Sequence, residues 1–282
     1  MGISVTLDLM FKIEEVKMSK YKLIIFETNK KDGCMSLAPK FYPENYSLEE
    51  RKKVLQSVKN KVGKKYQFDG NHIFQPYQKD VEKDVDYPDG KYIKISEKDL
   101  VKEDYWDEKL PCDILMIDTK YPNIVIGHRM ADCPVIIAED IKKQVVAVSH
   151  CGASQINREV PRLTIEALKK EKNSNSEDIH VYIGSCIKKE NYKYDRYPLW
   201  ATNKKVWENK ITLRDGIYYI DLISAIKKQL KDENIPTENI TESPYDTLLS
   251  DDYYSHTEAH NNPNYQQGQN FVGCFYQKIS ES

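Results

Sequence analysis

Short apolar runs rich in β-branched residues recur along the chain, with polar or glycine-containing turns between them. Such runs predict buried β-strands, because branched side chains pack well on a pleated sheet. The two strongest candidates are 134–138 and 144–149, separated by the polar stretch 139–143. Further strands are predicted near 22–28, 71–77, 91–95, 113–118, 123–127, 179–184 and 270–277.

Three other segments have the apolar spacing of amphipathic helices. Ser47 and Glu50 form a capping-box pattern, which predicts a helix over 48–62. A second helix is predicted near 158–171, and a third begins at Asp221, a residue type that caps helix N-termini well. Many strands with three helices predict an α/β (α+β) fold, a mixed β-sheet sandwich with flanking helices.

Length and charge narrow the class of protein. No Gly/Ser-rich or Pro-rich linker divides the 282 residues, so we predict a single domain over 1–282. The formal net charge is −2 with both signs interspersed, which gives no reason to expect nucleic acid or an anionic membrane as a partner. No apolar run approaches the ~18 residues that cross a bilayer, and no signal peptide is visible.

The six cysteines are scattered without the spacing of a disulfide framework. A chain of this size does not need disulfides to stabilise its core, and free thiols are typical of a reducing compartment. We therefore expect a cytoplasmic protein.

Cys133 and His150 stand at opposite ends of the predicted strand–turn–strand unit. Neighbouring strands bring residues so placed side by side, and a thiolate with an imidazole suits zinc. The spacing matches no established zinc motif, and a buried free cysteine with a core histidine is the competing interpretation. One more histidine would complete three donors and leave a position open for chemistry.

The residues around this pair resemble a known family. Ala131-Asp132-Cys133-Pro134 precedes one apolar strand, and a second ends at Ser149-His150-Cys151-Gly152 before a helix. This order resembles the YfiH-type laccase-domain family, whose members are also called multicopper polyphenol oxidases or purine nucleoside phosphorylases. Further matching elements follow in order over most of the chain: Thr28-Asn29, Asn71-His72, Cys112-Asp113, Gly184-Ser185-Cys186 and Ser255-His256.

The resemblance implies a YfiH-like laccase-domain fold and a catalytic zinc. The family's ligand positions, two histidines and one cysteine, map onto His72, Cys133 and His150. The first match departs from the family's Gln-x-His element, because Gly70 replaces the glutamine. Several coppers would need more histidines than the six present.

Three further side chains are candidates for catalysis. Asp132 and His256 are of the types that transfer protons, although Asp132 can instead orient a ligand and His256 can be a solvated loop residue. Cys186 is either a reactive thiol or a small buried side chain.

Family members that phosphorolyse nucleosides hold phosphate with arginines, whose planar guanidinium binds oxygens in pairs. The positions expected to carry them are Asn29, Ser154, Thr257 and Gln269. We therefore expect turnover that does not require phosphate.

The resemblance implies a zinc-dependent enzyme that deaminates a purine nucleoside or related small heterocycle, or cleaves its glycosidic bond. Two alternatives stay open: a repurposed member that catalyses another zinc-dependent reaction, and a non-catalytic zinc-binding protein. We expect the substrate pocket where the loops after Thr28, Gly184 and Ser255 converge. The segment 256–268 is either its mobile cover or a disordered surface loop.

Overall fold

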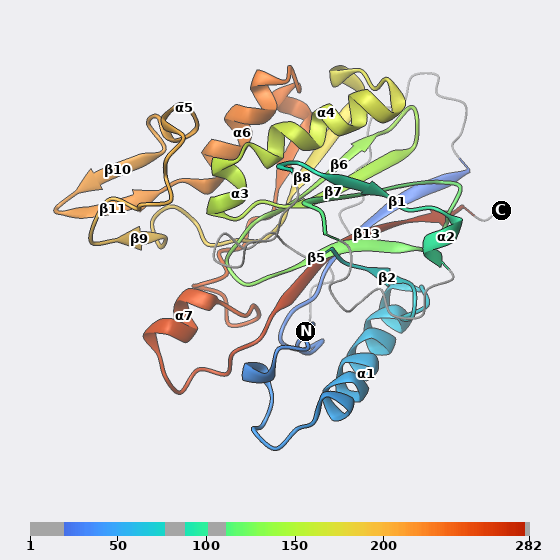
Figure 1. Cartoon of the computed structure of the whole chain (residues 1–282), viewed down its shortest axis with the longest axis horizontal. Helices are drawn as coiled ribbons and strands as arrows, with labels where there is room; N and C mark the ends of the chain where they lie inside the picture. The colour runs from blue at the N-terminus through green and yellow to red at the C-terminus, as the bar shows by residue number, and fades with distance from the viewer. Residues whose placement is uncertain (1–19, 77–87, 101–110, 280–282) are drawn as a thin grey trace.

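The computed structural model describes residues 20–76, 88–100 and 111–279. Two β-sheets pack face to face, and helices cover their outer faces (Figure 1). The layers run from helices α4 (Val160–Lys172) and α6 (Leu222–Asp232), through a six-stranded and a four-stranded sheet, to helix α1 (Leu48–Tyr66). The predicted α/β sandwich with flanking helices is confirmed. No helix in the described ranges is long and apolar enough to cross a bilayer.

The six-stranded sheet is the centre of the molecule. Its order is β12 (Ile240–Glu242), β8 (Ile179–Ile183), β6 (Val135–Asp140), β7 (Val145–His150), β4 (Ile114–Asp118) and β3 (Tyr92–Lys94). Along β4, Ile114 and Met116 face the helices, whereas Leu115 and Ile117 face the other sheet. Burial on both faces explains why these strands are continuous apolar runs.

The four-stranded sheet has the order β1 (Tyr21–Glu27), β13 (Asn270–Lys278), β5 (Val125–Met130) and β2 (Ile73–Phe74). Helix α1 (Leu48–Tyr66) covers its outer face by packing Leu55 and Val62 against Phe26 and Phe271. The predicted capping box is present at its start, where the Glu50 carboxylate accepts from the Ser47 backbone N–H at 2.7 Å.

The helical layer on the other side contains α4 (Val160–Lys172) and α6 (Leu222–Asp232), and the short α3 (Ala153–Asn157) precedes it. Between α3 and α4, Arg158 reaches Asp113 at the start of β4. The Nη1–Oδ2 and Nη2–Oδ1 distances are 3.2 and 3.1 Å, and the Asp113 carboxylate also accepts from the Gly90 N–H. This largely buried pair therefore ties the chain after His150 to the central sheet.

A third, small sheet is absent from the sequence-based prediction. Its order is β10 (Ile211–Arg214), β11 (Ile217–Ile220) and β9 (Lys193–Tyr194), and it projects from the body beside α5 (Lys204–Trp207) (Figure 1). The remaining short helices are α2 (Glu97–Leu100) and α7 (His256–Asn261).

A cavity of about 40 Å³ borders β1, β6 and β8, and Glu139 lines it. Burial raises the pKa of this carboxyl from its ordinary 4.5 to about 7, although the Tyr276 hydroxyl donates to it. The unfolded chain loses this proton at lower pH than the folded protein does. Folding stability should therefore fall as pH rises from about 4.5 to about 7 and stay lower above that window.

Glu139→Gln keeps an acceptor for Tyr276 but removes the titration. We expect the variant to be more stable than the wild type at pH 8, by at most about 3 kcal/mol, with little difference at pH 4. Urea unfolding at the two pH values measures this, with the exposed Glu177→Gln as control. Equal pH dependence in Glu139→Gln and wild type would contradict the assignment.

Candidate functional site

Cys133 and His150 lie side by side at one end of the central sheet. β6 begins at Val135 and β7 ends at His150, and the antiparallel register pairs these two residues. The turn before β6 therefore brings Cys133 beside the end of β7. A Cβ atom on Gly152 would lie 2.9 Å from both Cys133 Sγ and His150 Cε1, so the thiol and the imidazole pack against one point of the backbone.

The electrostatics of the Cys133–His150 pair suit a soft metal ion. Burial lowers the pKa of His150 to about 4, so its imidazole is neutral at physiological pH. Its Nδ1 is buried and has no hydrogen-bond partner in the described part of the chain. Burial, with the nearby Asp132 charge, raises the pKa of the Cys133 thiol to about 12. A bound cation would replace the thiol proton and satisfy the orphaned nitrogen.

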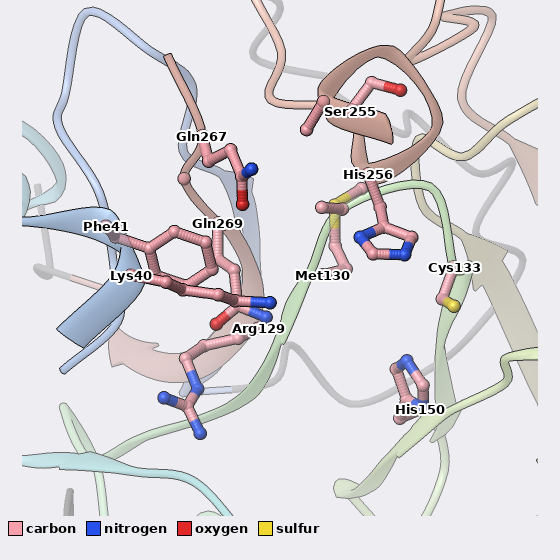
Figure 2. A pocket seen from close by; sticks show the side chains of 13 residues that line it. Lys40, Phe41, Arg129, Met130, Cys133, His150, Ser255, His256, Gln267 and Gln269 are labelled. Atoms are coloured by element: carbon pink, nitrogen blue, oxygen red, sulfur yellow. The ribbon is translucent and has the colours of Figure 1, made fainter. Parts of the chain in front are cut away.

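The pair lines a pocket of about 180 Å³ (Figure 2). Arg129 and Lys40 lie on the opposite side of the view, next to Gln267 and Gln269. The described residues that line this pocket include no Asp or Glu; they are Lys40, Phe41, Arg129, Met130, Ala131, Cys133, His150, Ser255, His256, Ala259, Gln267, Gly268 and Gln269.

His72 lies apart from the pair. Its side chain is 48% exposed, with Nδ1 3.9 Å from Asp69 Oδ2. The parallel register of β2 and β5 pairs Ile73 with Val125, which puts His72 at the end of β5 remote from the pocket. At the rise of a strand, that is roughly 15 Å from Arg129. The structure thus brings together two of the three predicted ligands, and no three His, Cys, Asp or Glu residues among those described form a group that could hold a metal ion.

A second partial match to the Gln-x-His element follows β2, with the glutamine present and the histidine absent. Gln75 is fully buried, and its amide group has no hydrogen-bond partner among the described residues. Read from Gln75, the element places Tyr77 at the histidine position, whereas the match at Gly70 lacks the glutamine. Tyr77 lies outside the described residues. The glutamine directly after the apolar residues Ile73 and Phe74 is the sequence signal for this second partial match.

His128 is an additional imidazole that the sequence patterns did not single out. It lies in β5, fully buried, with its ring centroid 6.2 Å from that of His150. Neither ring nitrogen has a hydrogen-bond partner in the described ranges. Burial and the neighbouring His150 hold its pKa well below the usual value, so the ring is neutral. A histidine within an apolar strand gives no pattern that distinguishes it from a core residue.

Asp132 holds the Cys133 turn in position. Its backbone has a φ of 81°, a left-handed conformation that aspartate tolerates better than most residues. Its carboxylate accepts from Thr247 Oγ1 at 2.7 Å and from the Thr257 backbone N–H at 2.6 Å. The side chain does not line the pocket. These contacts match the orienting role rather than direct proton transfer.

His256 and Cys186 occupy opposite environments. His256 is the exposed first residue of α7, and its imidazole extends toward Cys133 across the pocket (Figure 2). Cys186 is fully buried outside the pocket lining, and burial raises its pKa to about 12. A reactive thiol needs exposure and a low pKa, so these surroundings match the small buried side chain.

Two of the three expected loops reach the pocket. Lys40 and Phe41 come from the loop after Thr28, and the segment from Ser255 to Gln269 forms another wall. Residues of the third loop, at Gly184 and Ser185, pack instead against Glu27, whose carboxylate accepts from the Ser185 backbone N–H at 2.9 Å.

Residues 91–270 match the family described as multi-copper polyphenol oxidoreductase laccase. This span is more than half of the chain. The chain belongs to this family. The resemblance inferred from the residues around Cys133 and His150 is thereby confirmed.

One relative of known name is similar to about half of the chain. A purine nucleoside phosphorylase of Clostridium acetobutylicum is 30% identical over 146 residues, which is 51% of this chain and 60% of that protein. The chain thus spans less than two thirds of that relative's length.

Two solved structures share the fold. The Bacillus licheniformis hypothetical protein YfiH has a TM-score of 0.68 at 20% identity, with 90% of this chain and 92% of that one covered. YlmD from Geobacillus stearothermophilus has a TM-score of 0.68 at 18% identity, with 90% and 91% covered.

Proposed function

We propose that this protein is a zinc-dependent enzyme that acts on a purine nucleoside or a related small heterocycle in the pocket described above. The observation that carries the proposal is the partly buried thiol of Cys133 beside His150, whose buried Nδ1 has no hydrogen-bond partner among the described residues. The phosphorylase name of the Clostridium relative supports the substrate class. A volume of about 180 Å³ suits part of a small molecule and not a polymer.

Each residue has a distinct part in this proposal. Cys133 and His150 would hold the metal, which when bound lowers the pKa of water or polarises a substrate oxygen. His256 faces this end of the pocket and would move a proton to or from the substrate. Asp132 would position the Cys133 turn and the first turn of α7 without touching the substrate. Cys186 would take no part in the reaction.

The test is turnover of adenosine, inosine and guanosine by the zinc-loaded protein, with and without phosphate, followed by chromatography of the products. We expect His256→Ala to lower turnover by about a hundredfold or more, as loss of a proton-transfer group does. His260→Ala is the matched control, because it removes an imidazole from the same helix but outside the pocket lining.

Other outcomes would separate the alternatives. Bound zinc without turnover of any purine nucleoside favours the repurposed or non-catalytic protein. Equal losses in His256→Ala and His260→Ala would contradict the part given to His256.

A further inference from the structure

One side of the pocket is cationic. Arg129 comes from the end of β5, and Lys40 comes from the 3-10 turn Pro39–Phe41. Figure 2 shows both side chains beside the amide of Gln269, on the side away from Cys133 and His150. With no acidic side chain among the described lining residues, a negatively charged group is the favoured occupant.

Ser36 binds Arg129 directly, and it binds the segment that carries Lys40 through Tyr42. Its buried hydroxyl accepts from Arg129 Nη1 at 3.2 Å, which orients the guanidinium. Its carbonyl accepts from the Tyr42 hydroxyl at 2.6 Å, so the segment that carries Lys40 is folded back over the pocket. The Arg129 charge also opposes the rise that burial causes in the pKa of the adjacent Cys34 thiol. The Arg129 charge is therefore held in place and acts on its surroundings.

We propose that Arg129 and Lys40 form a subsite for a phosphoryl group. A guanidinium binds two phosphate oxygens at once, and a lysine adds a point charge that suits a dianion. The subsite would take over from the arginines absent at Asn29, Ser154, Thr257 and Gln269, using side chains from β5 and the 39–41 turn. The phosphoryl group is either inorganic phosphate or the phosphate of a purine nucleoside 5′-monophosphate; the purine part rests on the proposed function.

The experiment is calorimetric titration of the zinc-loaded protein with three probes: inorganic phosphate, inosine 5′-monophosphate and inosine. The variants are Arg129→Gln, Arg129→Lys and Lys40→Gln, with Arg214→Gln as matched control. Arg214 pairs with Glu190 on the distal third sheet, so it tests for a general effect of charge. Thermal unfolding checks that each variant is folded. If Arg129→Gln does not fold, Lys40→Gln still tests the subsite, because Lys40 is exposed and its replacement should not affect folding.

We expect affinity for the phosphorylated probe to fall at least about tenfold in Arg129→Gln and about threefold in Lys40→Gln. Arg129→Lys should be intermediate, and Arg214→Gln should match wild type. Binding of phosphate alone identifies the free ion as the source, whereas binding of the monophosphate alone identifies the substrate's own phosphate.

Two results would overturn the subsite: no binding of either phosphorylated probe to wild type, or equal binding to the wild type, to Arg129→Gln and to Lys40→Gln. Binding of phosphate or of the monophosphate without turnover of inosine or of its 5′-monophosphate would overturn the proposed function and leave the subsite standing. Turnover of inosine without binding of either phosphorylated probe would overturn the subsite and leave the proposed function standing.

Discussion

Replacing Cys133 with alanine should abolish tight zinc binding. The thiolate is one of the two donors that the structure places together, and the remaining imidazole alone holds zinc weakly. The expected loss of affinity exceeds the roughly 10- to 100-fold that removal of an outer partner of a metal ligand costs. Native mass spectrometry of zinc-loaded protein, together with a competition titration against a chelator, measures both occupancy and affinity.

Two controls make this result specific. Cys34→Ala removes another partly buried free cysteine, one that does not line the pocket. His72→Ala removes the exposed imidazole that the structure leaves apart from the pair. Both variants should retain zinc. Full occupancy in Cys133→Ala would refute the assignment, and loss of zinc in His72→Ala would restore that residue as a ligand.

Arg158→Met should lower the free energy of unfolding by about 3–5 kcal/mol, because it removes the guanidinium that neutralises the buried Asp113 carboxylate. The Asp113 side chain is 1% exposed, and it retains a contact with the Gly90 backbone N–H. Urea unfolding at pH 7 measures the change.

Arg162→Met is the matched control, since this arginine pairs with Glu166 on the surface of α4. Exposed pairs of this kind contribute about 0–1 kcal/mol. Similar losses of unfolding free energy in the two variants would show that the buried Arg158–Asp113 pair stabilises the fold no more than an exposed pair does.

Long amphipathic helices and buried strands were predictable because their patterns are periodic and local. Helix α1, strands β6 and β7 and helix α6 lie within a few residues of the predicted ranges. The third sheet was missed because its strands are short and only partly buried, which weakens the apolar pattern. The Asp215-Gly216 turn between β10 and β11, with φ of 49° and 78°, was the available signal for a hairpin.

The site was predictable only where neighbouring strands form it. Cys133 and His150 are joined by one strand–turn–strand unit, so their proximity followed from the sequence. Arg129 and Lys40 come from segments about ninety residues apart, and nothing in either segment shows that they share a pocket. His72 lies apart from Cys133 and His150, because the register of β2 against β5, which the sequence does not specify, decides which residues reach the pocket.

The hydrogen bond between Asp132 and the first turn of α7 couples the position of His256 to the turn that carries Cys133. A helix of six residues has little stability alone, yet the Thr257 N–H in its first turn is bound by a carboxylate from the Cys133 turn. Any shift of that turn when Cys133 exchanges its proton for a metal would therefore pull on the helix. The position of the His256 imidazole would therefore depend on whether the Cys133 thiol holds a proton or a metal ion. Helix α7 would move together with the Cys133 turn and not independently of it.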